Sequence, residues 1–162
     1  MFFVDSDFFE GDGADATFSA RLKSGGNGKI LVQVYATSGM VAKSPYRVDY
    51  GYTTSGNGWF IPQSMATNPM AGLIGVASDV CASGCVGWVQ IRGPIEAVSF
   101  AVASQTGSIG DAVSWASAAG LKATSSTYIG AVHQVGILTA QATGTNTGDI
   151  FLVGNCNAES RA

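Results

Sequence analysis

The chain has 162 residues, of which 46% are hydrophobic and only 12% are charged, with 22 glycines and 4 prolines. This length is typical of one domain that buries its own core, and so few charges indicate that neighbouring proteins cover much of the surface. The net charge of -3 argues against nucleic acid as a partner, because binding phosphates requires clustered Lys and Arg.

The first 28 residues are predicted to form an extended N-terminal arm. They show no sustained hydrophobic period and end in the glycine-rich sequence SGGNG. Residues 1–15 carry five carboxylates and no Lys or Arg, whereas five of the eight basic residues fall between Arg21 and Arg47. This asymmetry indicates an acidic arm that meets a basic surface, on its own chain or on another. Alternatively, Phe9, Thr17 and Phe18 belong to a short edge strand.

Residues 29–156 are predicted to form an all-β domain, followed by a tail at 157–162. Alternating apolar residues between Gly/Ser/Thr/Asn clusters predict about nine strands. They fall at 29–36, 46–52, 58–62, 71–78, 86–93, 95–104, 111–117, 127–140 and 149–154. The segment 111–120 could also be a helix that stops at Gly120, but we favour a strand. The pattern predicts a single antiparallel β-barrel or sandwich.

An internal echo runs through the second half of the chain. Residues 74–93 align without gaps on residues 135–154 after a shift of 61 positions. The glycine pairs 75/136, 87/148 and 93/154 coincide, and so do the apolar pairs 76/137, 89/150 and 91/152. Both segments are built as an apolar strand, a small polar tip, a second apolar strand and a glycine. We predict two related hairpins, placed by pseudo-symmetry in one barrel.

Two cysteines stand at the tip of the first hairpin. In the second hairpin the positions of Cys81 and Cys85 are Ala142 and Asn146, so the tip does not require sulfur. The chain has three Cys and one His, too few nearby ligands for a zinc site. We expect free thiols rather than a disulfide, because the protein is expected to be made in the cytoplasm. Replacing both cysteines by serine should then leave folding nearly unchanged, with Ser83, Gly84 and Gly87 setting the tip.

The sequence predicts no enzyme, cofactor, metal or membrane partner. His133 has no acidic neighbour, and the nucleophile-elbow, P-loop and zinc-protease motifs are absent. GDGADA at 11–16 lacks the strand and helix of a dinucleotide loop, and the acidic run lacks the spacing of a calcium loop. No stretch reaches the about 18 uninterrupted apolar residues of a membrane helix, and the start lacks the features of a signal peptide. We therefore expect a soluble protein.

The tryptophans allow two interpretations. Trp59, Trp88 and Trp115 could mark a sugar-binding face. However, the alternation in VGWVQIRG places Trp88, Gln90 and Arg92 together on a face of mixed character, which is typical of a subunit interface. We favour the subunit interface and keep carbohydrate binding as the alternative.

Three segments carry a resemblance to a known family. LIGVASDVCASGCVGWVQIRGP (73–94), GSIGDAVSWASAAG (107–120) and VGILTAQATGTNTGDIFLVG (135–154) resemble the small decoration, or cement, proteins of tailed-phage capsids. Those proteins often show a V-G-V-A phrase, a small-residue stretch, G-x-W-V-Q-x-x-G and then G-D-x-V. The likeness covers about residues 72–154 and does not extend to residues 1–45.

The resemblance implies a structural virion protein on the outer capsid surface, synthesised in the host cytoplasm. Its partners would be the major capsid protein, which it clamps to its neighbours, and itself, as a homo-oligomer that is most often a trimer. Independently of the resemblance, the four Phe of the first nine residues are expected to be buried, because burying each contributes about 1.5–3 kcal/mol. The arm either packs on its own barrel or docks on a neighbouring subunit or a different protein, such as the capsid. The capsid-binding residues would be Phe2, Phe3, Phe8, Phe9, Asp5 and Asp7. The alternative function is a receptor- or glycan-binding module of a phage fibre or spike.

Overall fold

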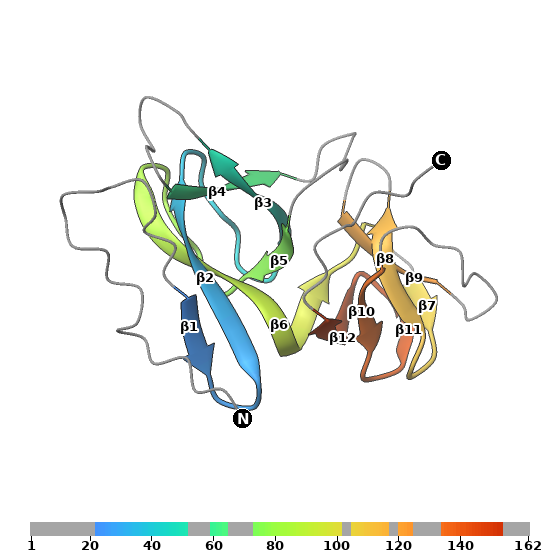
Figure 1. Ribbon diagram of the computed structural model, residues 1–162. Helices are drawn as coiled ribbons and strands as arrows, with labels where there is room; N and C mark the ends of the chain where they lie inside the picture. The colour runs from blue at the N-terminus through green and yellow to red at the C-terminus, as the bar shows by residue number, and fades with distance from the viewer. Residues whose placement is uncertain are drawn as a thin grey trace, which may run out of the picture.

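The computed structural model describes residues 22–51, 59–64, 73–101, 105–116, 120–124 and 134–153. These residues contain strands and no helix, which confirms the predicted all-β class. The strands are β1 (Leu22–Gly25), β2 (Lys29–Ala36), β3 (Pro45–Gly51), β4 (Trp59–Ser64), β5 (Leu73–Ala77), β6 (Cys85–Ser99), β7 (Gln105–Gly107), β8 (Ala112–Ala116), β9 (Gly120–Thr124), β10 (Gln134–Leu138), β11 (Ala142–Thr145) and β12 (Thr147–Val153). Figure 1 shows them in two groups joined by the long strand β6.

The first group is a closed five-stranded ring, here called barrel 1. Its strands pair in the order β2, β4, β3, β5 and β6, and β6 pairs again with β2. All contacts are antiparallel except that between β2 and β4, which is parallel at Val34 and Phe60. The apolar side chains of β2 that alternate toward the inside, Val32, Val34 and Ala36, are at most 1% exposed. The predicted barrel is thus confirmed.

The second group repeats this ring and is here called barrel 2. The end of β6 pairs with β12, and β12, β10, β8 and β9 follow in order, all antiparallel. A parallel bridge between Phe100 and Leu121 closes the ring, and the Ala101 N–H donates to the Leu121 carbonyl at 2.8 Å. β2, β3, β4, β5 and β6 of barrel 1 therefore correspond to the end of β6, β8, β9, β10 and β12 of barrel 2.

The two barrels also share local hydrogen bonds. In barrel 1 the Lys43 N–H donates to the Ala77 carbonyl at 3.0 Å, and in barrel 2 the Gly110 N–H donates to the Leu138 carbonyl at 2.9 Å. Lys43 and Gly110 both have positive φ, 61° and 92°. The turns before β3 and β8 are therefore equivalent, although one of them places a lysine where glycine is the favoured residue.

The echoed glycines occupy equivalent close contacts. A Cβ at Gly75 would lie 2.7 Å from the Gln90 carbonyl oxygen, and a Cβ at Gly136 would lie 2.5 Å from that of Phe151. Both distances are well below van der Waals contact, so each strand approaches its neighbour at a point that only glycine allows. The two related hairpins are confirmed. The sequence analysis placed both in one barrel, but they lie in two separate rings.

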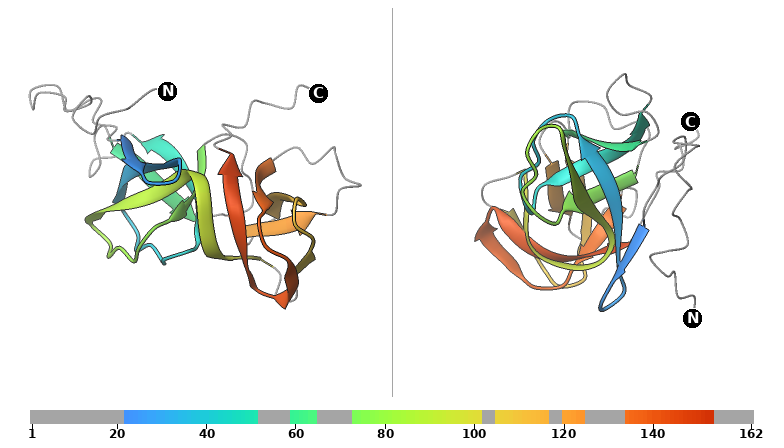
Figure 2. Two further views of the ribbon diagram at one scale, coloured as in Figure 1. Left: turned by 90° about the horizontal axis from the view of Figure 1, so that it is seen from below. Right: turned by 90° about the vertical axis from the view of Figure 1, so that its left-hand side faces the viewer.

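β6 belongs to both barrels. Its first half pairs with β2 and β5, and its second half pairs with β12. The sequence predicted two strands here, 86–93 and 95–104, separated at Pro94, but the chain continues as one strand. Gly93 has a φ of 94°, which lets the strand bend where it leaves barrel 1. Figure 2 shows this bend from below, between the two groups.

The two cores meet at the junction. Barrel 1 encloses a cluster that includes Tyr46, Val48 and Val89, and barrel 2 encloses one that includes Val113, Leu121 and Ile150. Ile74 and Val76 of β5 pack in the cluster of barrel 2, although their strand belongs to barrel 1. Because of this shared packing and the shared strand, we expect the two barrels to unfold together.

Several strand boundaries differ from the prediction. β1, β7, β9 and β11 were not predicted; they are three to five residues long and too short to show a period. β1 pairs with β2, so the sheet includes Leu22–Gly25, which precede Lys29 and lie within the range assigned to the arm. Residues 1–21 and 154–162 lie outside the described residues, and the division into arm, domain and tail stays a prediction. The segment 112–116 is the strand we favoured.

Candidate protein-interaction surfaces

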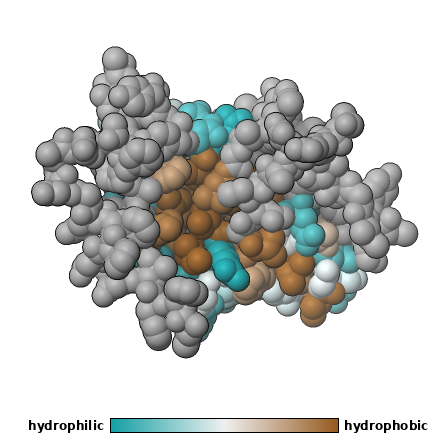
Figure 3. Space-filling model, viewed as in Figure 1, coloured by the Kyte–Doolittle hydropathy of each residue, from teal (hydrophilic) through white to brown (hydrophobic). Residues whose placement is uncertain are grey.

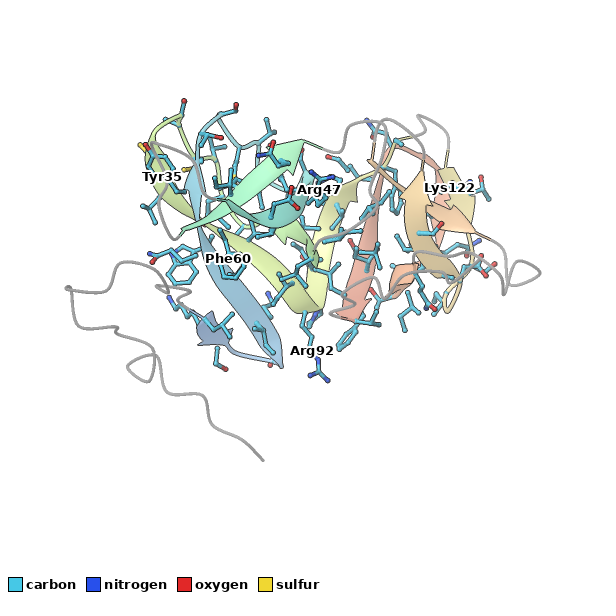
Figure 4. All side chains as sticks on the ribbon, turned by 45° about the horizontal axis from the view of Figure 1, so that its top comes forward. Tyr35, Arg47, Phe60, Arg92 and Lys122 are labelled. Carbon is cyan, nitrogen blue, oxygen red and sulfur yellow. The ribbon has the colours of Figure 1, made fainter. Side chains whose placement is uncertain are left out.

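Three exposed valines gather at one end of barrel 1. Met40 and Cys81 form a two-way backbone pair there, at 2.7 and 3.1 Å, with both side chains buried. The residues that follow Met40 and precede Cys81 therefore lie opposite each other, and both are exposed valines: Val41 at 62% and Val80 at 77%. Val86, 45% exposed, stands at the start of β6 opposite Tyr35, which is labelled in Figure 4. We call Val41, Val80 and Val86 the valine tip.

The three positions of barrel 2 that correspond to the valine tip are polar, although the neighbouring Ile109 is 69% exposed. The 61-residue shift places Gln141 at the position of Val80 and Thr147 at that of Val86. Ser108 corresponds to Val41, because the two residues accept equivalent hydrogen bonds. The Asp111 N–H donates to the Ser108 carbonyl, and the Ser44 N–H donates to the Val41 carbonyl. The fold therefore does not require apolar side chains at these three positions. Exposed apolar groups that the fold does not need are typical of a protein-binding surface.

The hairpin tip beside the valines is held by hydrogen bonds rather than sulfur. The Ser83 hydroxyl donates to the Thr37 carbonyl at 2.8 Å, and Gly84 has a φ of 80°. In the structure both thiols are free, with Cys81 buried and Cys85 exposed. A Cβ at Gly87 would lie 3.1 Å from the Cys81 sulfur, so Cys81 is a core residue packed beneath that glycine.

The sulfurs of this hairpin differ in chemistry. Burial raises the pKa of the Cys81 thiol above its ordinary value of 9.0, and the nearby Cys85 adds to the increase. Cys81 is therefore an inert structural thiol, whereas Cys85, the other described cysteine, is open to reagents.

The predicted interface residues Trp88, Gln90 and Arg92 do not share one face. Gln90 is 3% exposed, and its Nε2 donates to the carbonyls of Arg92 at 3.1 Å and Pro94 at 3.0 Å. The register is regular from Trp88 to Gln90, and a bulge at Ile91 interrupts the alternation between Gln90, opposite Leu31, and Arg92, opposite Ile30. Gln90 thus fixes the backbone at the junction of the barrels, and its side chain is not available to a partner.

Trp88 and Arg92 remain accessible. Arg92 is exposed, and Trp88 is partly buried, with the Lys23 Nζ 5.8 Å from its ring centroid. Figure 3 shows a further apolar area in the middle of the view, over β2, β5 and β6 and bordered by residues drawn in grey. In the described part of barrel 1, the outer face therefore combines aromatic, aliphatic and basic groups, as interfaces often do.

Other predicted positions lie outside the described residues. These are the arm residues Phe2, Phe3, Phe8, Phe9, Asp5 and Asp7, together with His133 and Cys156. Trp59 and Trp115 lie in β4 and β8. The valine tip was not predicted, although the alignment of the two hairpins already pairs Val80 with Gln141 and Val86 with Thr147.

Among the described residues, no group of three or more His, Cys, Asp or Glu could hold a metal ion. In the same part of the chain, no helix has the length and hydropathy to cross a membrane.

Comparisons with known proteins give only distant likenesses, all of them to solved structures. No protein-family model matches the sequence, and no curated protein matches it. Among solved structures, the N-terminal base of the head fibre protein gp8.5 of bacteriophage phi29 covers 83% of this chain and 99% of its own. The identity is 10% and the TM-score is 0.47.

Proposed function

We propose that the protein is a structural virion protein that decorates the outside of an icosahedral phage capsid. It would act as a homotrimer and stabilise contacts between neighbouring major capsid proteins. The observation that carries the proposal is the valine tip, three exposed valines of barrel 1 whose counterparts in barrel 2 are Ser108, Gln141 and Thr147. The sequence resemblance over residues 72–154 supports the choice of a capsid as the partner.

The mechanism is mass action. A subunit that binds the expanded shell, and not its dissociated parts, stabilises the shell by the free energy of that binding. Several weak contacts suffice, because a trimer that bridges neighbouring capsid proteins binds with avidity. Deleting residues 1–15 should leave folded barrels that bind shells poorly, because the Phe residues of the arm would contribute apolar docking area.

Binding to shells tests the proposal directly. Purified protein is incubated with expanded shells that lack decoration and with unexpanded shells, and bound protein is measured after sedimentation. We expect saturable binding to expanded shells and an increase in their melting temperature. A glycan array tests the alternative of a fibre or spike module. Binding to glycans without binding to shells would overturn the capsid assignment and favour the Trp88 face as a sugar site.

A further inference from the structure

Three basic residues, Lys23, Lys29 and Arg92, lie on β1, β2 and β6 where the β1–β2 hairpin meets β6. Arg92 pairs with Ile30, the neighbour of Lys29, and Lys23 stands on β1 opposite Leu31. A Cβ at Gly93 would lie 2.9 Å from the Lys29 Cα, which shows how closely the hairpin turn approaches β6. Figure 4 shows Arg92 beside the start of β2, pointing away from the ribbon. We call Lys23, Lys29 and Arg92 the basic cluster.

No carboxylate of the described residues neutralises this cluster. The described parts of β1 and β2 contain no Asp or Glu. The carboxylates of β6 and β12, Glu96 and Asp149, lie beside the Ala97 bulge, where Asp149 accepts from the Ala97 N–H at 2.9 Å. Barrel 2 does not repeat the cluster, since Val153 stands at the position of Arg92. The three positive charges are therefore a feature of barrel 1 that the fold does not require.

The negative charge of the chain lies elsewhere. The described residues contain six basic and five acidic side chains, a net charge of +1. Residues 1–21 contain Arg21 and five carboxylates, a net charge of -4. One chain thus holds two complementary charged surfaces, an acidic segment at 1–15 and the basic cluster.

We propose that the acidic segment of one copy binds the basic cluster of the next copy and closes a ring of subunits. This rests on the homotrimer in the proposed function. A trimer needs a contact between two different surfaces of the chain, because a surface that pairs with itself gives a dimer. The complementary surfaces supply such a contact. The carboxylates lie 7 to 17 residues before Leu22, a reach of roughly 24–58 Å in extended chain, which is enough to span to a neighbour.

The proposal assigns different contacts to the carboxylates and the phenylalanines of the arm. Its carboxylates, Asp5 and Asp7 included, contact the sister subunit and set the ring, since opposite charges fix register and orientation. Its phenylalanines and the valine tip remain for the capsid. Loss of the ring would then weaken shell binding indirectly, through lost avidity.

Light scattering of the free protein, without shells, tests the proposal separately from capsid binding. The full-length chain should be an oligomer at micromolar concentration in low salt and should dissociate in high salt, because screening weakens exposed ion pairs. Lys29→Glu and Arg92→Glu should each raise the dissociation constant about tenfold. Lys122→Glu, an equal charge change at an exposed position of β9 in barrel 2, is the matched control and should leave association unchanged.

A charge swap provides the second test. The double variant Lys29→Glu with Arg92→Glu should be monomeric, and adding Asp5→Lys, Asp7→Lys and Glu10→Lys should restore the oligomer. Circular dichroism checks that each variant is folded. A wild-type monomer in low salt, or an oligomer that the swap neither breaks nor restores, would overturn the proposal. Neither result would decide whether the protein binds shells, which the sedimentation experiment measures independently.

Discussion

Barrel 1 and barrel 2 have the same ring order, yet the side chains at their corresponding ends differ in polarity. The interiors agree: the pairs Gly75/Gly136 and Val89/Ile150 occupy equivalent places. The surfaces do not, because barrel 1 alone carries the valine tip and the basic cluster. Positions that agree in both copies are those the fold requires, whereas positions that differ are free to serve function.

The largest effect should come from the shared glycines. We expect Gly75→Ala and Gly136→Ala each to lower the free energy of unfolding by about 3 kcal/mol, because the new methyl group would collide with a backbone carbonyl. Denaturant titration measures both. Gly26→Ala, which has no atom within 4 Å of the new Cβ, is the control and should change little. A large loss at only one of the two positions would show that the barrels are not equivalent.

Gln90, at the junction, is a position at which the two barrels differ, because barrel 2 has Phe151 there. Gln90→Ala removes two hydrogen bonds from a buried bulge and leaves the carbonyls of Arg92 and Pro94 without that donor. We expect a loss of about 2 kcal/mol in the free energy of unfolding. The exposed Gln141, changed to Ala, is the control. An unchanged stability in Gln90→Ala would mean that the bulge is held by the backbone alone.

The turns before β3 and β8 allow the residues at their equivalent positive-φ positions, Lys43 and Gly110, to be exchanged. Lys43→Gly should raise the free energy of unfolding by about 1 kcal/mol or less, because it relieves a left-handed lysine. Gly110→Lys should lower it by about 1 kcal/mol for the same reason. Thermal melts of both variants against the wild type measure the pair. Equal signs for the two changes would contradict the equivalence of the turns.

The smallest effect concerns Cys81, whose counterpart is Ala142. Cys81→Ala should cost about 1 kcal/mol or less, and Cys85→Ala should cost nothing measurable, since Cys85 is exposed. This revises the expectation that neither thiol matters. The folded-state pKa of Cys81 is raised, so the stability linked to its proton is complete below pH 9.0 and is lost as the pH rises further. Melting curves of wild type and Cys81→Ala should therefore converge at high pH.

The sequence predicted what depends on local pattern. Alternation located β2, β3 and β12, and the glycine echo found the duplicated hairpins. It could not show the second ring, because closure through Phe100 and Leu121 joins segments that no local pattern connects. The sequence also could not show the bulge at Ile91, which interrupts the alternation between Gln90 and Arg92. The position of the valine tip could not be predicted either, because it depends on the pairing of Met40 with Cys81, which are far apart in the sequence.

The central claim is that the valine tip binds the capsid and that barrel 2 lacks this surface. The most direct measurement is shell binding by a variant that carries the barrel 2 residues, Val41→Ser with Val80→Gln and Val86→Thr. Ile109→Ala, which removes an exposed apolar group of barrel 2, is the control. We expect the triple variant to fold, to keep its oligomeric state and to lose shell binding, while the control binds as the wild type does. Undiminished binding by the folded triple variant would contradict the account.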